Sequence, residues 1–403
     1  MNIVVVGGGL AGANAVEELR VQGYSGDITL IGAEPHLPYE RPPLSKGLQL
    51  GTVEPDSVFV HDVQWYADQQ VDLVTGDPVS EIDLDRGHVA VATRQWSYDR
   101  LLLATGASSR HLDRADRSGA DVIYLRTLDD ALDLKARLAG HVLIIGAGWI
   151  GLEVAAAARQ ANAAVTVVEA GALPLARVLG REVAPVFADL HRDHGVDLRL
   201  DTSVASVEHV SGTTTVRLTD GHALTPDVVV VGIGAEPNLE LGAKAGLVVD
   251  RGILVDARLR ASDPHVYAAG DVATHAHPTL GRLRVEHWDT AIHQGRHAAR
   301  TMLGDDDPYT RQPYFFTDQY DLGMEYIGNV GRGGYDDVVI RGDMSERVFT
   351  ALWIRRNRVV AGMHVNDWDA LEVLRSWVGK EAPSILRDVD VALADLPGPD
   401  SDA

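Results

Sequence analysis

One pattern occurs twice in this chain: a short apolar strand, a turn with three glycines, and a helix that starts within the turn. Both copies have the spacing Gly-x-Gly-x-x-Gly, and an acidic residue follows about twenty residues later. The glycines are Gly7, Gly9 and Gly12 in the first copy and Gly146, Gly148 and Gly151 in the second, and the acidic residues are Glu34 and Glu169. The repeat predicts two separate nucleotide-binding domains, each built on a parallel sheet.

Each residue of the pattern has its own physical task. In the first copy Gly7 permits the tight turn, Gly9 lets the backbone approach a pyrophosphate, and Gly12 lets the helix pack against the strand. The helix directs the positive end of its dipole at the phosphates. Glu34, at the end of the following strand, can accept hydrogen bonds from ribose hydroxyls. Every element recurs in the second copy.

A single copy of the pattern is weak evidence, since glycine-rich turns are common in ordinary folds. Two complete copies indicate two dinucleotide sites, and FAD with a nicotinamide nucleotide is the obvious pair, because hydride passes between nicotinamide and flavin. The chain has no cysteine, which excludes a dithiol pair, a Cys nucleophile and any cluster held by Cys thiolates. Redox chemistry in this chain therefore needs a bound organic cofactor.

Short apolar runs along the chain predict parallel strands that are buried on both faces. Helical stretches between them, such as 11–22 and 150–160, indicate doubly wound α/β sheets. The predicted strands are Ile3–Val6, Ile28–Ile31, Leu101–Ala104, Val142–Ile145, Val165–Val168 and Val228–Val231. Ser211-Gly212, inside an alternating stretch over residues 199–218, predicts a hairpin.

The pattern changes from residue 313 onward, where Val348, Thr350, Leu352 and Ile354 alternate with other positions at period two. This alternation predicts an antiparallel sheet, and hence a C-terminal α+β domain. The tail at 396–403 is expected to be flexible.

Length and charge limit the alternatives. A chain of 403 residues predicts two or three domains. Its net charge of −22 repels phosphate backbones, so nucleic acid is not an expected partner. The longest apolar stretch, 142–158, contains three glycines and Glu153 and therefore predicts a strand running into a helix, not a membrane span. We expect no targeting segment, no membrane association and a cytoplasmic protein.

Several further motifs give the chain a specific resemblance. They are Tyr39-Glu40-Arg41-Pro42-Pro43-Leu44-Ser45-Lys46, Ala104-Thr105-Gly106, Leu125-Arg126-Thr127, Gly232-Ile233-Gly234-Ala235-Glu236-Pro237-Asn238, Tyr267-Ala268-Ala269-Gly270-Asp271 and Glu286-His287-Trp288. Together they resemble the FAD-dependent pyridine nucleotide oxidoreductases built like glutathione reductase. Among these the chain is most similar to the NADH-dependent ferredoxin reductases of oxygenase systems, over about residues 2–395.

The resemblance implies a domain organisation. Residues 1–108 and 237–308 would form a split FAD-binding domain, 109–236 an inserted NADH-binding domain, and 309–395 a C-terminal domain. It also implies that NADH reduces FAD and that single electrons leave for a small iron–sulfur ferredoxin. The protein would be a monomer or a homodimer.

The resemblance also assigns individual residues. Beside the glycines and acids of the two turns, the implied FAD contacts are Arg41, Lys46, Val79, Arg126, Asp271 and Trp288, and Gly234 is implied for NAD. Lys46 would lie near the flavin ring and pair with Glu153, and the two would organise hydride transfer; Trp288 would begin a helix aimed at the flavin. Simpler explanations exist: Lys46 as a surface charge, Asp271 as a helix cap and Trp288 as a core residue.

Glu169 predicts a preference for NADH, because a carboxylate repels the 2′-phosphate of NADPH. Residues 170–174 include no Lys or Arg that would neutralise that phosphate, and Arg177 is the nearest basic residue downstream. The sixteen histidines show no metal-binding spacing, so no metal site is expected.

The electron acceptor is less constrained. Several ferredoxin reductases have Trp where this chain has Phe316. An enzyme with another acceptor, such as oxygen, a quinone or monodehydroascorbate, is therefore a first alternative. A second is a redox-sensing interaction protein with slow turnover, similar to apoptosis-inducing factor. Ferredoxins are usually acidic, so docking on this acidic chain needs a local basic patch, for which Arg296, Arg300 and Arg311 are the candidates.

Overall fold

The computed structural model describes residues 1–331, 333–396 and 398, and these form two compact units. The first unit consists of Met1–Glu40, Asp56–Ser108 and Glu236–Phe315, and the second of Arg41–Pro55, Ser109–Ala235 and the chain from Phe316 onward. Apart from residues 396 and 398, the predicted flexible tail lies outside the described residues. The domain boundaries predicted from the sequence follow cofactor-binding roles and stay a prediction.

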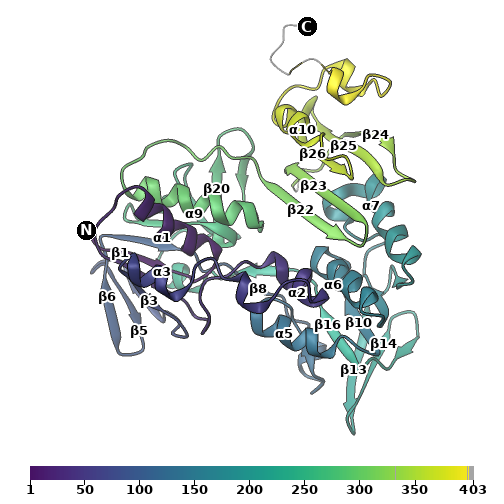
Figure 1. Cartoon of the computed structure of the whole chain (residues 1–403), viewed down its shortest axis with the longest axis horizontal. Coiled ribbons are helices and arrows are strands. Elements are labelled where there is room, and N and C mark those ends of the chain that lie inside the picture. Colours follow the sequence, from purple (N-terminus) through teal and green to yellow (C-terminus); the bar gives the residue numbers. More distant parts are fainter. Residues whose placement is uncertain (332, 397, 399–403) are drawn as a thin grey trace. The chain divides into compact units, whose positions relative to one another are not determined.

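The first unit is built on a parallel sheet of five strands in the order β19-β7-β1-β2-β3. These strands are β1 (Ile3–Val6), β2 (Ile28–Ile31), β3 (Val71–Val74), β7 (Arg100–Leu103) and β19 (Val266–Ala268). β1 and β2 are buried at every position, which explains why Thr29 is their one residue that is not apolar. Helices α1 (Leu10–Val21) and α9 (Trp288–Met302) pack along each other, as Figure 1 shows.

Smaller elements complete this unit. They are the antiparallel sheet of β4 (Glu81–Asp83), β5 (His88–Val91) and β6 (Arg94–Ser97), the sheet of β18 (Ile253–Val255), β20 (Ala273–His277) and β21 (Gly281–Leu283), and helices α3 (Val63–Asp68) and α8 (Glu240–Lys244). β8 (Ala107–Ser109) and β17 (Ala235–Pro237) span the points where the chain passes from one unit to the other.

The second unit contains another parallel sheet of five strands, in the order β12-β11-β10-β16-β9. Its strands are β9 (Val122–Ile123), β10 (His141–Ile145), β11 (Ala164–Val168), β12 (Asp197–Arg199) and β16 (Val228–Val231). Its helices are α2 (Gly47–Leu50), α4 (Asp113–Asp116), α5 (Leu128–Arg137), α6 (Trp149–Gln160) and α7 (Ala176–Asp193). A capping box between Thr127 and Asp130 starts α5, and a positive φ of 75° at Gly180 kinks α7.

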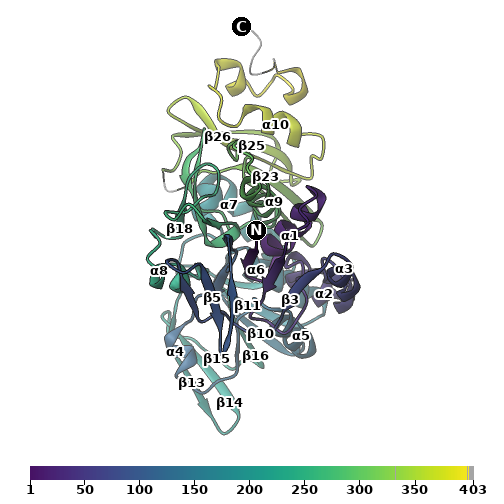
Figure 2. The ribbon, with the colours of Figure 1, turned by 90° about the vertical axis from the view of Figure 1, so that its left-hand side faces the viewer.

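A hairpin extends from this second sheet (Figures 1 and 2). β13 (Val204–Val210) pairs antiparallel with β14 (Thr213–Leu218), and β15 (Ala223–Leu224) pairs with β14. Ser211 and Gly212 form the turn with φ of 51° and 79°. The predicted hairpin is therefore confirmed, with both turn residues in the left-handed region that such turns need.

The C-terminal part of the second unit is a five-stranded sheet in the order β22-β23-β26-β25-β24. Its elements are β22 (Tyr314–Gln319), β23 (Leu322–Gly328), β24 (Asp337–Asp343), β25 (Val348–Arg355), β26 (Arg358–Val365) and helix α10 (Leu371–Trp377). Strands β23 to β26 pair antiparallel, as the sequence predicts. The alternation did not come from one exposed face, because neighbouring residues Phe349 and Thr350 are both buried.

The sequence-based fold prediction is confirmed: the chain has two Rossmann-like sheets and a C-terminal α+β part. All six predicted apolar runs lie in strands of the two parallel sheets, and their bounds differ by at most one residue. The apolar stretch 142–158 is β10, a turn and α6. In the described part of the chain, no helix has the length and apolar character needed to span a bilayer.

Candidate functional site

The first glycine turn forms a cradle at the N-terminus of α1. Gly7 has a φ of 124°, and a Cβ at this position would lie 2.0 Å from the carbonyl oxygen of Ala104. At Gly12 a Cβ would lie 2.1 Å from the carbonyl oxygen of Gly7. At Gly9, in contrast, no heavy atom of the described residues lies within 4 Å of an added Cβ. Two glycines thus permit tight packing, and the third leaves open space at the start of the helix.

The second turn has the same geometry at the N-terminus of α6. Gly146 has a φ of 104°, and its Cβ would lie 2.4 Å from the carbonyl oxygen of Gly232. A Cβ on Gly151 would lie 2.1 Å from the carbonyl oxygen of Gly146, whereas one on Gly148 would meet only Gly232, at 3.9 Å. Both helices lack a side-chain cap among the described residues, so their first N–H groups can bind a phosphate.

The predicted acidic residue Glu169 lies beside the second turn, and Glu34 follows β2, the strand that pairs with β1. The Glu169 carboxylate accepts hydrogen bonds from the backbone N–H groups of Ala147 and Gly171, both at 2.8 Å. Ala147 lies inside the second glycine turn, so Glu169 is fixed at the edge of that cradle. Glu34 accepts a hydrogen bond from the Tyr39 hydroxyl at 2.5 Å. The two Glu169 oxygens each accept one backbone N–H and, like any carboxylate oxygen, can also accept from a ribose hydroxyl.

The Lys46–Glu153 ion pair predicted from the resemblance is present in the second unit. Lys46 Nζ lies 2.8 Å from Glu153 Oε2, and the Glu153 side chain is only 4% exposed. Ser45 Oγ donates to the same oxygen at 2.5 Å, and Thr317 Oγ1 donates to Oε1 at 2.6 Å. A buried carboxylate is costly unless it is paired, and here three donors satisfy it: the neighbouring residues Ser45 and Lys46, and Thr317 from a distant segment of the chain.

Local structure fixes the Lys46 end of this pair. A 3₁₀ turn at Pro42–Ser45 starts with a proline and leads directly to Lys46. The Gln49 amide then donates to the carbonyl oxygens of Leu44 and Ala131, at 2.8 and 2.9 Å. Lys46 Nζ also lies 5.5 Å from the centre of the Phe316 ring, within the range of a cation–π interaction.

The site residues predicted from the sequence are divided between the two units. Gly7, Gly9, Gly12, Glu34, Val79, Asp271 and Trp288 belong to the first unit, and Arg41, Lys46, Arg126, Gly146, Gly148, Gly151, Glu153, Glu169 and Gly234 to the second. In the second unit the Arg41 guanidinium donates to the carbonyl oxygen of Arg126. Gly234 has a φ of 113°, which disfavours any other residue there.

Asp271 and Trp288 lie at two turns of the first unit. Asp271 is in a 3₁₀ turn at Gly270–Val272, where the Gly270 N–H donates to the Gln294 side chain at 2.9 Å. Trp288 is the first residue of α9, as predicted. Asp271 is therefore part of a helical turn rather than a cap preceding a longer helix.

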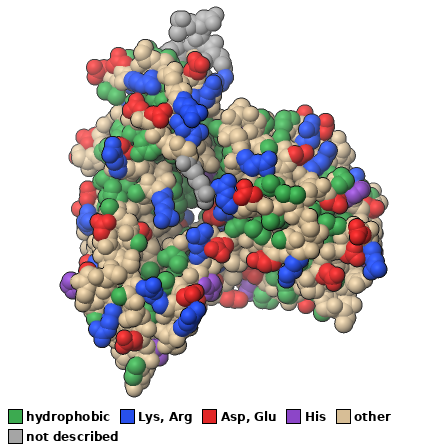
Figure 3. Space-filling view, turned by 180° about the vertical axis from the view of Figure 1, so that it is seen from behind, with side chains coloured by type: hydrophobic (Ala, Val, Ile, Leu, Met, Phe, Trp, Pro, Cys, Tyr) green, Lys and Arg blue, Asp and Glu red, His purple; other side chains and the backbone are tan. Residues whose placement is uncertain are grey.

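The arginines predicted to dock a ferredoxin are each paired with an acidic side chain of the first unit. The pairs are Arg296–Glu17 at 3.3 Å, Arg300–Glu18 at 3.0 Å and Arg311–Asp289 at 2.6 Å. The first two pairs join α9 to α1, and more than a third of each arginine side chain is exposed. On the face in Figure 3, basic and acidic side chains are likewise interspersed. The docking role of these arginines stays a prediction.

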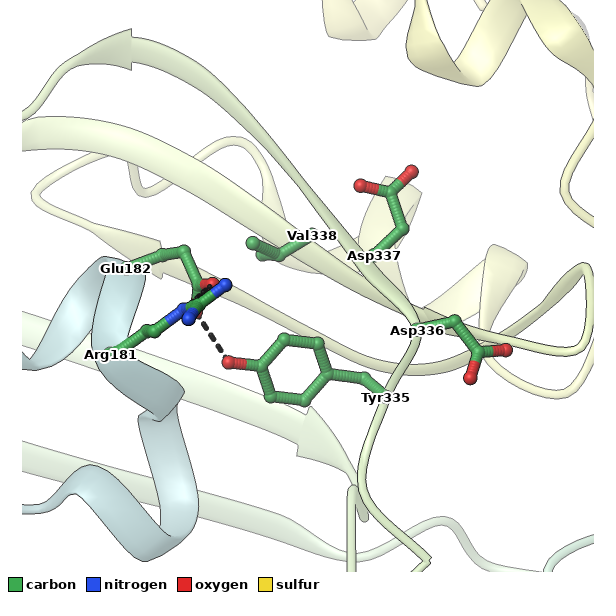
Figure 4. A pocket seen from close by; sticks show the side chains of 6 residues that line it. All are labelled: Arg181, Glu182, Tyr335, Asp336, Asp337 and Val338. Carbon is green, nitrogen blue, oxygen red and sulfur yellow. Dashed lines mark hydrogen bonds and ion pairs between the residues drawn. The ribbon is translucent and has the colours of Figure 1, made fainter.

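A pocket of about 470 Å³ in the second unit lies elsewhere. Figure 4 shows its lining residues: Arg181, Glu182, Tyr335, Asp336, Asp337 and Val338. The Tyr335 hydroxyl donates to the Glu182 carboxylate. This acidic pocket does not suit a pyrophosphate, and none of the predicted site residues lines it. The described residues also contain no group of three His, Cys, Asp or Glu that could hold a metal ion.

Sequence reasoning missed the residues that surround Glu153. Ser45 belongs to the motif at residues 39–46 but was given no role in the site, and Thr317, Gln319 and His191 were not predicted as site residues. One signal was available: Thr317 and Gln319 are spaced by two in a strand otherwise rich in aromatic residues, so they share a face.

Comparison with known proteins agrees with this architecture. Residues 1–295 match the family model described as pyridine nucleotide-disulphide oxidoreductase, and residues 314–396 match the model described as reductase C-terminal. The chain is 39% identical to rhodocoxin reductase of Rhodococcus erythropolis over 371 residues, which covers 91% of this chain and 86% of that protein. It is 37% identical to putidaredoxin reductase CamA of Pseudomonas putida over 377 residues, covering 91% and 88%.

A solved structure is also similar along nearly the whole chain. It is the crystal structure of the covalent putidaredoxin reductase–putidaredoxin complex, whose matching chain has a TM-score of 0.92 and 34% sequence identity. The match covers 98% of this chain and 97% of that one.

Proposed function

The chain belongs to the pyridine nucleotide-disulphide oxidoreductase family, and on this basis we propose that it is an NADH-dependent ferredoxin reductase. It takes a hydride from NADH through bound FAD and passes single electrons to a small iron–sulfur ferredoxin that serves an oxygenase or a P450. Because the chain has no cysteine, the disulphide chemistry in the family name is not available to it.

The pair of glycine cradles carries this proposal. Each has a turn that only glycine fits and an open position at a helix N-terminus, and each is followed by an acidic residue just after the neighbouring strand. Two such cradles in one chain match the needs of two dinucleotides. The first cradle, with Gly7, Gly9, Gly12 and Glu34, is proposed for FAD, and the second, with Gly146, Gly148, Gly151, Glu169 and Gly234, for NADH.

The remaining site residues have proposed roles at the two cofactors. Arg41, Val79, Arg126, Asp271 and Trp288 are proposed to hold FAD. FAD, when bound, supplies the chemistry that links a two-electron donor to a one-electron acceptor. Lys46 and Glu153 are proposed to position the nicotinamide. Hydride transfer itself needs no side-chain acid or base, so positioning and the exclusion of water account for the contribution of these residues.

Ferredoxin as the acceptor is supported by the comparisons. The similar solved structure is a complex of putidaredoxin reductase with putidaredoxin, and another relative is named as a ferredoxin–NAD(+) reductase component of an anthranilate dioxygenase system. The proposal also implies a cytoplasmic location, because NADH is an intracellular metabolite. The domain assignment follows: 1–108 with 237–308 for FAD, 109–236 for NADH, and 309–395 as the C-terminal domain.

Anaerobic titration of the purified holoprotein with NADH tests the first half of the proposal. One equivalent of NADH should remove the visible absorbance of one equivalent of flavin, and heat should release FAD rather than FMN. A protein that binds no flavin under these conditions, or whose flavin NADH does not reduce, would contradict it.

A further inference from the structure

A chain of buried polar side chains leads away from the Glu153 carboxylate in the second unit. Thr317 Oγ1 lies 2.6 Å from Glu153 Oε1, and Gln319 Nε2 lies 3.2 Å from Thr317 Oγ1. Gln319 Oε1 lies 2.8 Å from His191 Nε2, and the Tyr320 hydroxyl lies 3.5 Å from His191 Nδ1. These residues come from α6, β22 with the residue after it, and α7 (Figure 1).

Four members of this chain are almost completely removed from solvent, and Tyr320 at its end is half-buried. The exposed fraction is 4% for Glu153, 0% for Thr317, 1% for Gln319 and 0% for His191. Buried polar groups without partners cost free energy, so a continuous hydrogen-bonded chain of this kind constrains every member.

The direction of each hydrogen bond follows from the carboxylate. Glu153 is paired with Lys46, so its ionised oxygens only accept, and the single Thr317 hydroxyl hydrogen must point at Oε1. The Thr317 oxygen then accepts from the Gln319 amide nitrogen, which turns the Gln319 carbonyl toward His191. His191 must therefore carry a hydrogen on Nε2, and in the neutral ring Nδ1 is left as the acceptor that faces Tyr320.

Burial lowers the pKa of His191 to about 4, so the ring is neutral at neutral pH and its Nδ1 accepts from Tyr320. All donors therefore point the same way, from Tyr320 through His191, Gln319 and Thr317 to the carboxylate. Between His191 and the carboxylate, no member can reverse its hydrogen bond without leaving a buried neighbour unsatisfied.

We propose that Thr317 is a positioning residue for Glu153, held in its orientation by Gln319 and His191. Lys46 and Ser45 both contact Oε2 of the carboxylate, and Thr317 contacts Oε1. Two contacts on one oxygen leave the carboxylate free to swing about that oxygen. The third contact, on the other oxygen, fixes its plane and keeps Oε2 aimed at the Lys46 ammonium.

The proposal rests on the proposed function, in which Lys46 and Glu153 position the nicotinamide. A carboxylate that swings away from Lys46 would leave the ammonium unpaired for part of the time. Near-attack geometry would then be reached less often, and hydride transfer would slow while NADH binding through the glycine cradle stayed intact.

Three variants of the holoprotein test this. Thr317→Val keeps the shape of the side chain but removes the hydroxyl, whereas Thr317→Ser keeps the hydroxyl. Thr350→Val is the matched control, because Thr350 is also buried in the C-terminal sheet, at 2% exposure, and its hydroxyl has no partner within the described part of the chain. Removing an unpartnered hydroxyl should be neutral or stabilising.

The first readout does not depend on activity. The chain has four lysines, Lys46, Lys135, Lys244 and Lys380, so limited acylation followed by mass spectrometry reports on Lys46 with three internal references. In Thr317→Val, Lys46 should be acylated at least threefold faster relative to the other lysines. Thr317→Ser and Thr350→Val should match the unaltered protein.

The second readout is flavin reduction by NADH in a stopped-flow instrument. Thr317→Val should lower the limiting rate about tenfold with little change in the NADH concentration at half-saturation, and Thr317→Ser should recover most of that loss. If Thr317→Val does not fold, Gln319→Leu replaces it, since it removes the donor that orients the Thr317 hydroxyl, and the same direction of change is expected.

Wild-type Lys46 labelling together with a wild-type limiting rate in a folded Thr317→Val or Gln319→Leu protein would overturn the proposal. Failure of the proposed function gives a different result. A protein without ferredoxin activity, or without flavin reduction, would still show faster Lys46 labelling in Thr317→Val if the positioning contact is real.

Discussion

Replacing Glu153 by Gln tests the role of the buried ion pair. Gln keeps the volume of the side chain and removes the charge that balances Lys46. Three donors now meet at this carboxylate: Lys46 at 2.8 Å, Ser45 at 2.5 Å and Thr317 at 2.6 Å. An amide has only one acceptor oxygen, so its NH₂ group must face at least one of these donors.

The size of the effect follows from these contacts. A hydrogen bond to a charged group contributes about 1.5–3 kcal/mol, and the ammonium of Lys46 would lose its charged partner. If the loss of this energy raises the barrier to hydride transfer by the same amount, the limiting rate of flavin reduction should fall roughly 10- to 100-fold. The binding of NADH should change far less, because the glycine cradle and Glu169 are untouched.

The assay is anaerobic stopped-flow reduction of the flavin over a range of NADH concentrations. Glu182→Gln is a suitable control, because Glu182 is also paired, with Tyr335 and Arg181, and lies at the acidic pocket in the same unit. Its limiting rate should stay within twofold of the unaltered protein. A folded, flavin-loaded Glu153→Gln protein that is reduced at the unaltered rate would refute the role assigned to the pair.

Three other predictions concern cofactor choice, the first cradle and acid stability. The ratio of kcat/KM for NADH over NADPH should be at least tenfold, and Glu169→Gln should reduce it, because the repulsion of a 2′-phosphate is lost; a ratio near one in the unaltered protein would contradict this. Gly9→Ala should weaken FAD retention with little change in the melting temperature of the apoprotein, since its Cβ meets open space. Gly12→Ala should lower that temperature by several degrees, because its Cβ would lie 2.1 Å from a carbonyl oxygen. Equal melting temperatures for the two variants would argue against the packing described. Burial lowers the pKa of both His191 and His275 from the ordinary value of 6.5 to about 4, so the unfolded chain binds more protons between these values. The free energy of unfolding should therefore rise with pH by up to about 1.4 kcal/mol per unit for each histidine and level off above 6.5, and urea midpoints that do not change between pH 4.5 and 6.5 would contradict this.

Much of the fold could be predicted because its signals are local. A glycine whose Cβ would collide with a carbonyl oxygen leaves its mark at one position, as Gly7 and Gly151 do. The apolar strands of a parallel sheet are buried on both faces and read as short continuous runs. The hairpin at Ser211 and Gly212 was visible for the same reason: two residues determine the turn.

The surroundings of Glu153 could not be predicted in this way because they are assembled by tertiary structure. Ser45 and Glu153 are 108 positions apart, and Thr317 is 164 positions from Glu153. The Lys46–Glu153 pair itself came from a family resemblance, not from spacing. His191 looked like one of many structural histidines, and only its contact with Gln319, 128 positions away, gives it a place in the chain of hydrogen bonds.

The alternating sequence of β25 predicted the strand but not the burial of both its faces. The alternation at residues 348 to 354 indicated a strand in an antiparallel sheet correctly, although a period of two is typical of a strand with one solvated face. Six consecutive residues of β25 are buried, from Phe349 to Ile354. Burial of the second face depends on packing by other elements, which the strand's own sequence does not record.

The central claim, that electrons from NADH leave this chain for a ferredoxin, is tested most directly by NADH-dependent reduction of cytochrome c with and without a purified [2Fe–2S] ferredoxin from an oxygenase or P450 system. Adding the ferredoxin should raise the rate at least tenfold and in a saturable manner, while direct turnover with ferricyanide stays the same. The ferredoxin-dependent rate should also change with ionic strength more than the ferricyanide rate does, because salt screens the charges of two associating proteins, and this chain has a net charge of −22. A cytochrome c rate that no such ferredoxin increases, accompanied by rapid consumption of oxygen or by a long-lived reduced flavin, would contradict the account.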